Sequence, residues 1–408
     1  MVPLVMLAIM AGCAAFLFFK GTLVHGIIMV FNALIAGFIA FGFFEMLARF
    51  LVQQSPGIAA WAPLICFALL FILTFAVLQT GALQVAKGKP DLGKLPEQIG
   101  RPVCGVVLGY LLTGYILVAA ALAPLPNQYP YPRFSPRSPN PARPAKPVLS
   151  PDGFVTGLFA TVSKGSLSAI QQPRSFAVLH ADYVDQLYLN RHKVADKVGL
   201  MTSMHTIDVP RKGVRQAPDS LRDTDGRAPS ISPGESLTLV RVELAPRGLR
   251  DAGKFTLSQF RLVCGLKSSG KAALTGQGQA VYPLGYIGEK ARLERKPLDE
   301  VITATTSSSE PVKIDLAFAV PASLTPLVLE FKGNDIAQVS PPAPGEEALE
   351  MVAFGTPAQA SEAAGQSQTP APEGTPGTPP PRSDRKSRKA GSKSEERARS
   401  LTGTVEEN

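Results

Sequence analysis

Four apolar runs in the first 123 residues constrain this chain most strongly. A membrane-spanning helix needs about 20 largely apolar residues, and each run comes close to or exceeds that length. Only 9 of the 123 residues are Lys, Arg, Asp or Glu, so a wholly soluble protein is excluded. We expect residues 1–123 to form a four-helix transmembrane domain. The runs are Val2–Phe19, about Leu23–Ala48, about Ile58–Ala86 and Val103–Ala123.

Charged residues are scarce inside these runs, and their positions limit what the helices can do. Glu45 is the only acidic residue in a span, and it lies one helical turn before Arg49. This spacing predicts an interfacial ion pair at the end of the second helix. Among Lys, Arg, Asp, Glu and His, the one other residue within a span is His25, near the start of the second helix. A proton-driven pump is therefore disfavoured, whereas a passive pore formed by oligomerisation stays open.

Small residues predict close helix packing in the fourth run. Gly105 and Gly109 form a GxxxG motif, and Gly114 follows. Glycines let helix backbones approach each other in lipid. The motif fits packing within the chain and also fits contact between copies in a homo-oligomer.

Basic residues between the runs predict the orientation in the membrane. Lys20 and four residues of the third-to-fourth loop lie on one side, and Arg49 alone lies on the other. Because cytoplasmic loops carry the excess of Lys and Arg, we expect the N-terminus and the C-terminal region to be extracytoplasmic. When the basic residues beyond the fourth run are counted too, each side has five Lys and Arg residues, and the charge difference between the sides disappears. The four loop residues are Lys87, Lys89, Lys94 and Arg101, and the four beyond the fourth run are Arg133, Arg137, Arg143 and Lys146.

Lys20-Gly21 joins the first two runs, and Gly105 and Gly109 lie near the start of the fourth. With these motifs, residues 1–125 resemble the colicin V production protein (CvpA) family of bacterial inner-membrane proteins, in which a basic–Gly pair joins the first two spans and a Gly-xxx-Gly pattern marks the fourth. Thr113-Gly114 stands where the family has Arg-Gly, so no role of that arginine carries over. The resemblance implies a multi-pass inner-membrane protein linked to toxin production or export and envelope physiology. It implies no enzyme activity, no catalytic residue and no cofactor.

Beyond the spans, residues 124–151 predict a Pro-rich linker. They hold ten prolines, a density typical of polyproline II, with a reach of roughly 80 Å for 28 residues if fully extended. Residues 152–232 predict short helices followed by a loop, because apolar residues recur every three to four positions before Gly and Pro become frequent. Three histidines fall in this region, but their spacing is not that of a metal motif, and we predict no metal site. They are His180, His192 and His205.

Residues 233–341 predict an immunoglobulin-like β-sandwich. Ser236–Leu244 alternates polar and apolar residues, and five further short strand candidates follow at sandwich spacing. Cys264 is the only cysteine in this region, so a disulfide framework is excluded there. The five further candidates are Phe260–Leu266, Gly278–Tyr282, Lys290–Lys296, Lys313–Val320 and Leu327–Phe331.

Residues 342–408 predict a disordered tail, because no apolar periodicity remains. Its basic run, Arg382–Lys389, is interspersed with Ser and Asp, so we expect a solvated tail and no nucleic-acid partner.

We therefore expect a non-enzymatic membrane protein with an appended binding domain. Its partners would be the lipid bilayer and an unidentified envelope protein or ligand. The alternative is an oligomeric pore or transport component of the inner membrane.

Overall fold

A computed structural model describes most of the chain outside its C-terminal segment. The described residues are 2–85, 93–164, 175–246, 253–267, 277–304, 310–340 and 347–354. The predicted tail therefore lies outside the described residues from position 355 onward.

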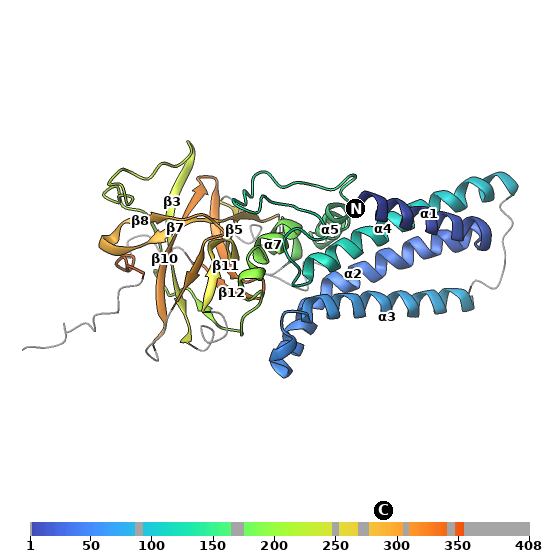
Figure 1. The fold of residues 1–408 in the computed structure, drawn as a ribbon, viewed down its shortest axis with the longest axis horizontal. Coiled ribbons are helices and arrows are strands. Elements are labelled where there is room, and N and C mark those ends of the chain that lie inside the picture. Colours follow the sequence, from blue (N-terminus) through green and yellow to red (C-terminus); the bar gives the residue numbers. More distant parts are fainter. Residues whose placement is uncertain are drawn as a thin grey trace, which may run out of the picture. The chain divides into compact units, whose positions relative to one another are not determined.

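Four helices in the described residues are long and apolar enough to cross a membrane. They form a row: α1 packs mainly on α4, α4 on α2, and α2 on α3 (Figure 1). The inner helices α4 and α2 bury 50% and 39% of their most apolar window, and the outer helices α1 and α3 bury 11% and 17%. The row is not strictly linear, because α3 also contacts α4, where the Phe71 ring lies 4.8 Å from that of Tyr115. Their bounds are α1 Val2–Lys20, α2 Leu23–Gln54, α3 Ala62–Val85 and α4 Lys94–Leu122.

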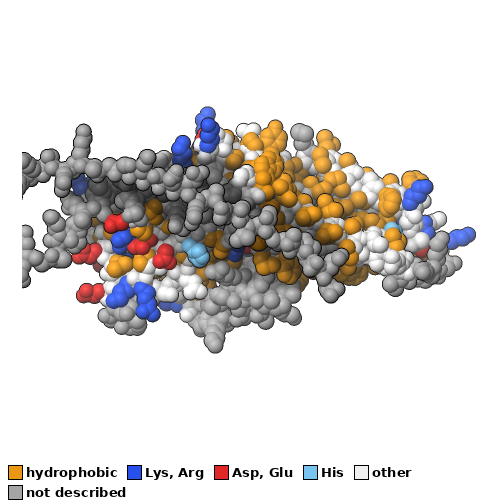
Figure 2. Space-filling view, turned by 90° about the horizontal axis from the view of Figure 1, so that it is seen from below, with side chains coloured by type: hydrophobic (Ala, Val, Ile, Leu, Met, Phe, Trp, Pro, Cys, Tyr) orange, Lys and Arg blue, Asp and Glu red, His pale blue; other side chains and the backbone are white. Residues whose placement is uncertain are grey.

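Hydrophobic side chains cover much of the helices on the face drawn in Figure 2. The α2 helix has 32 residues, a length of about 48 Å at 1.5 Å per residue. That exceeds the roughly 30 Å of a bilayer's hydrocarbon core. A helix of this length extends past the apolar layer or tilts within it, and its last turns carry Glu45 and Arg49.

Glycines set the close approach of α4 to its neighbours within the chain. A Cβ at Gly105 would lie 2.4 Å from the Ala14 Cα, and one at Gly109 would lie 2.5 Å from the Met10 Cα. Both contacts join α4 to the backbone of α1. Any larger residue would force these two helices apart.

Polar contacts align the helices along their length. At the α1–α2 turn, the Gly21 N–H donates to the Leu17 carbonyl at 3.0 Å, one residue beyond Lys20. The Leu23 N–H at the start of α2 donates to the Glu97 carboxylate of α4 at 3.2 Å. Deeper in the row, the Asn32 amide of α2 donates to the Gln79 side chain of α3 at 3.0 Å.

The Pro-rich segment is not the extended spacer that its composition predicts. It folds back on itself, because the Ala145 N–H donates to the Arg133 carbonyl at 2.8 Å. Tyr131 and Phe134 are buried in a cluster with Leu117 near the end of α4. Aromatic and charged residues between the prolines make these contacts. The prediction of an extended linker rested on the number of prolines and did not take those residues into account.

Three short helices follow, α5 Pro151–Ser163, α6 Phe176–Leu179 and α7 Tyr183–Asn190. Residues 206–232, expected to be a loop, instead contribute two strands that pair with β3. These strands are too short for their alternation to be recognised in the sequence.

The β region consists of two antiparallel sheets and a two-stranded ribbon among the described residues. The larger sheet has the order β1-β3-β10-β7-β8, with β2 also paired to β3, and the smaller has the order β12-β11-β5-β6. Both sheets contribute to one hydrophobic core that includes Val242, Leu316, Leu262 and Phe331. The strands are β1 Ile207–Asp208, β2 Val214–Gln216, β3 Glu235–Leu244, β4 Lys254–Thr256, β5 Phe260–Leu266, β6 Gln279–Val281, β7 Pro283–Ile287, β8 Leu293–Arg295, β9 Val301–Thr303, β10 Val312–Pro321, β11 Leu324–Phe331 and β12 Asp335–Gln338.

The first described residues of the expected tail, 347–354, pack on the larger sheet instead of being free. The Val352 N–H donates to the Asp315 carboxylate at 2.9 Å, and Asp315 pairs with Arg241 across β3 and β10. The Phe354 ring lies 5.3 Å from that of Tyr286. Prediction of a disordered tail from position 342 is thus wrong for these eight residues, because a few apolar side chains and backbone groups suffice to hold them.

The glycine contacts predict that Gly109→Leu separates α1 from α4. Overpacking of this kind costs about 1–3 kcal/mol or more, which thermal unfolding of the full chain in detergent would detect as a lower midpoint. The matched control is Gly12→Leu on α1, because a Cβ at Gly12 meets no atom within 4 Å. Equal midpoints for the two variants would contradict the packing described.

Candidate functional site

The most distinctive cluster of side chains lies where the end of α2 meets α6, α7 and the smaller β-sheet. It joins acidic, basic and amide groups from four parts of the chain. We call this set the junction network. Its members are Glu45 and Arg49 on α2, His180 after α6, Asp182 and Gln186 at α7, Arg261 on β5 and Glu330 on β11.

An arginine–glutamate pair forms the centre of the junction network. Arg261 and Glu330 lie directly opposite each other on β5 and β11. The Arg261 Nε donates to the Glu330 carboxylate at 3.1 Å, and its Nη2 also pairs with it. Both side chains are about 2–3% exposed, so each charge depends on the other. Removing one partner of such a buried pair costs about 3–5 kcal/mol.

Arg261 also holds the helical segment that precedes α7. Its Nη1 donates to the Asp182 carboxylate at 2.6 Å, and its Nη2 donates to the Leu179 carbonyl. The Tyr282 hydroxyl donates to the same Asp182 carboxylate at 3.2 Å. One guanidinium therefore fixes the smaller sheet to the end of α6 and the start of α7.

His180 connects this arrangement to the membrane helix. Its Nε2 lies 2.8 Å from the Glu45 carboxylate, an ion pair that departs from the alignment of an ideal hydrogen bond. Its Nδ1 lies 2.8 Å from the Gln186 side-chain oxygen. Gln186 in turn donates through Nε2 to Glu330 at 2.5 Å. A continuous chain of polar contacts thus runs from α2 to β11.

The contacts of His180 determine its protonation state. Because the Gln186 Nε2 donates to Glu330, the Gln186 oxygen must be the atom that faces the His180 Nδ1, and this ring nitrogen must donate. The His180 Nε2 faces a carboxylate. Each ring nitrogen therefore has an acceptor at 2.8 Å, which favours a doubly protonated imidazolium, and the Arg261 Nη2, which can only donate, lies farther from Nδ1 at 3.5 Å.

The surrounding charges agree with an imidazolium. Burial alone would lower the pKa of His180, but the charge and hydrogen bond of Glu45, followed by the charge of Glu330, raise it above its ordinary value. With His180 protonated, three carboxylates face three cations in the junction network. Such balance is what a set of buried charges requires.

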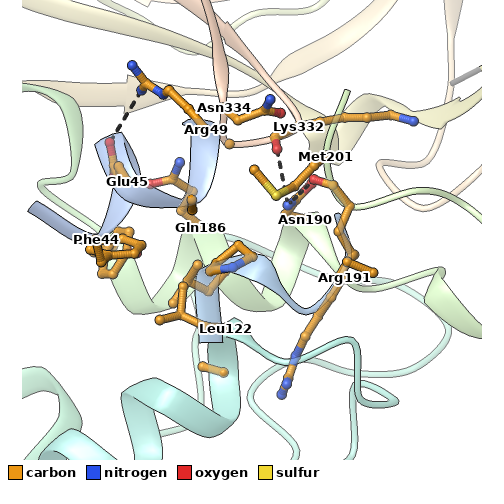
Figure 3. Close-up of a pocket in the computed structure, with 18 residues that line it drawn as sticks. Phe44, Glu45, Arg49, Leu122, Gln186, Asn190, Arg191, Met201, Lys332 and Asn334 are labelled. Atoms are coloured by element: carbon orange, nitrogen blue, oxygen red, sulfur yellow. Dashed lines mark hydrogen bonds and ion pairs between the residues drawn. The ribbon is translucent and has the colours of Figure 1, made fainter. Parts of the chain in front are cut away.

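A small pocket lies beside the junction network (Figure 3). Phe44 of α2 and Leu122 of α4 supply apolar walls, and Asn190 of α7 and Asn334, after β11, supply polar ones. Its cavity is about 60 Å³, room for roughly four water molecules. The pocket therefore suits solvent or a very small ligand.

A buried lysine lies in the turn that borders this pocket. Lys332 has a left-handed backbone with φ of 51°, and its Nζ donates to the Lys254 carbonyl at 3.0 Å. Burial lowers the pKa of Lys332 to about 8. Its amine points away from the pocket centre in Figure 3, so we assign it to holding the turn.

The residues singled out in the sequence fall into two groups. Glu45 and Arg49 lie 3.4 Å apart, and Glu45 also faces His180, so they enter the junction network. Lys20, Gly21, Gly105 and Gly109 lie in the helix row, away from this network. Gly114 packs on α5, where a Cβ would lie 2.5 Å from the Pro151 carbonyl oxygen.

The other histidines do not join His180. The His192 Nε2 lies 3.3 Å from the Pro136 carbonyl, and His205 is exposed. Among the described residues, no group of three or more His, Cys, Asp or Glu side chains is arranged to hold a metal ion.

Sequence reasoning missed Arg261, Glu330 and Gln186. Opposite charges in two predicted strands were a usable signal, but the register of β5 against β11 was needed to pair them. The link from His180 to Glu45 joins residues 135 positions apart, and no local pattern predicts it.

Comparison with protein-family models, curated proteins and solved structures finds no match to this chain.

The raised pKa of His180 predicts a pH dependence of stability. The imidazolium contributes its full stabilisation below about pH 6.5, the ordinary pKa of histidine. That contribution is lost as the pH rises through the raised pKa of the folded state. We expect the unfolding midpoint of the full chain in detergent to fall across this window.

His180→Gln should flatten this part of the pH profile. His205→Asn is the matched control, since His205 is exposed and Asn tolerates the left-handed φ of 59° found there. A wild-type profile in the His180→Gln variant would show that another group titrates.

Proposed function

We propose that this protein is a non-enzymatic membrane protein of the colicin V production type. In this proposal the helices anchor a β-domain, and the domain binds a protein or ligand of the bacterial envelope. The observation that carries the proposal is the junction network. It ties Glu45 of α2 to Glu330 of β11 through His180 and Gln186, which supports a domain held against the helices.

The use of charged groups in the junction network supports a structural role. Its three carboxylates each face a cation, and Arg261 donates to three separate acceptors. Groups engaged in this way fix elements in place and are not free to act on a substrate.

We further propose that the β-domain is an immunoglobulin-type sandwich. If β1, β3, β7 and β10 are lettered A, B, D and E, their order in the larger sheet, β1-β3-β10-β7, is the order A-B-E-D of one immunoglobulin sheet. The strands β12, β11, β5 and β6 follow the order G, F, C and C′ of the other. Domains of this architecture commonly present loops and faces for binding.

The alternative proposal is a pore or transport component. A single row of helices supports it poorly, since a lumen would require several copies around a common axis. Oligomeric state in detergent and ion conductance in a planar bilayer separate this alternative from the anchor.

The proposal places the protein in the bacterial inner membrane with its β-domain extracytoplasmic. We expect a periplasm-active reporter fused after Asn408 to be active and a cytoplasm-active one to be inactive. The reverse pattern would leave the β-domain facing cytosolic partners and would contradict the envelope role.

The functional test is deletion of the gene in its own host. We expect reduced release of peptide toxin or increased uptake of a membrane-impermeant dye, restored by the wild-type chain. Arg261→Glu should restore neither at equal abundance, because it places two acidic side chains face to face. Lys313→Glu is the matched control: it also places a carboxylate opposite an acidic partner, Glu243, but at a side chain 48% exposed, where water screens the charge, so it should restore both. Normal toxin release and dye exclusion in the deletion strain would refute the proposal.

A further inference from the structure

We propose that residues 148–163 insert into the bilayer as a re-entrant segment beside α2 and α4. The sequence places these residues after the last span. Their contacts with α4 and α2 put them at the depth of the hydrocarbon core. The exposed face of α5 would then contact lipid acyl chains.

The start of α5 packs on the middle of α4. The apolar part of α4 runs from Pro102 to Leu122, which at 1.5 Å per residue is about 30 Å, the thickness of the hydrocarbon core. Gly114 packs against Pro151 and lies eight residues before Leu122. The start of α5 is therefore about 12 Å below the end of α4.

Contacts at both ends of α5 agree with this depth. The Tyr110 hydroxyl donates to the Leu149 carbonyl at 2.8 Å, and Tyr110 lies deeper in α4 than Gly114. The Phe159 ring stacks on that of Phe41 at 5.3 Å, a few residues before Glu45 on α2. The chain thus reaches its deepest point near Leu149 and rises along α5 toward the junction network.

The side-chain hydroxyls of α5 hydrogen-bond within the helix itself. The Thr156 hydroxyl donates to the Asp152 carbonyl at 2.9 Å, and the exposed Thr161 hydroxyl donates to the Gly157 carbonyl at 2.9 Å. Such bonds to the preceding turn leave no hydroxyl hydrogen that needs water. Ser163 likewise donates to Ala160 at 2.9 Å.

Charged residues are nearly absent from the segment. Lys146 and Lys164 flank the segment, and Asp152 is the only charged residue between them. Asp152 is 1% exposed. Its carboxylate accepts from the Tyr131 hydroxyl and lies 3.5 Å from the Arg133 guanidinium. A charge inside a membrane requires this kind of pairing.

The segment exposes large apolar side chains. Val148, Leu149 and Phe154 are 58%, 66% and 48% exposed. The Phe154 ring lies 5.3 Å from that of Tyr110 on α4, so this surface continues the lipid-facing side of the helix row. Continuity with the membrane-facing surface identifies its occupant as lipid.

The chain offers a direct test of depth, because Trp61 is its only tryptophan. The probe is Phe154→Trp in a Trp61→Phe background, with the full chain reconstituted in phosphatidylethanolamine–phosphatidylglycerol vesicles whose acyl chains carry bromine. We expect bromine to quench this tryptophan at least threefold more strongly than a reference tryptophan at Ile231, a partly exposed loop residue of the β region. Iodide in the aqueous phase should show the opposite order.

A second variant guards against misfolding of the first. Leu149→Trp in the same background changes a more exposed side chain and should be quenched by bromine nearer the bilayer centre. Equal bromine quenching at positions 149, 154 and 231, with ready access of iodide to all three, would overturn the proposal.

Discussion

The buried pair of Arg261 and Glu330 is the interaction on which the rest of the arrangement depends. Two charges removed from water are stable together only when further hydrogen bonds satisfy their remaining donors and acceptors. The Arg261 guanidinium finds Asp182 and the Leu179 carbonyl, and Glu330 finds Gln186. Those requirements order the α6–α7 region, which in turn presents His180 to Glu45 on α2.

This dependence gives the membrane helices and the β-domain a common mechanical link. The last turns of α2 carry Glu45 to the region where α6, α7 and the smaller sheet meet. The junction network therefore contains Glu45 from α2 and Arg261 and Glu330 from the strands β5 and β11. Protonation of His180 keeps the set balanced, so stability of the link follows pH.

Much of the architecture could be predicted from the sequence. Apolar length predicted the four helices, and two-residue alternation predicted strands that overlap β3, β5, β6, β8, β10 and β11. The Pro-rich segment was predicted wrongly, because Tyr131, Arg133 and Phe134 pack between prolines. Among the strands missed were β1 and β2, of two and three residues. Of the junction network, Glu45 and Arg49 were recognisable one turn apart, whereas the other members depend on tertiary contacts.

The claim that α2 and the β-domain are joined through His180 is tested most directly by a double-mutant cycle. Free energies of unfolding of the full chain in detergent would be measured at pH 6 for wild type, Glu45→Gln, His180→Gln and the double variant. The account predicts a coupling energy of about 1–3 kcal/mol between the two positions. Additive effects, with a coupling near zero, would contradict it.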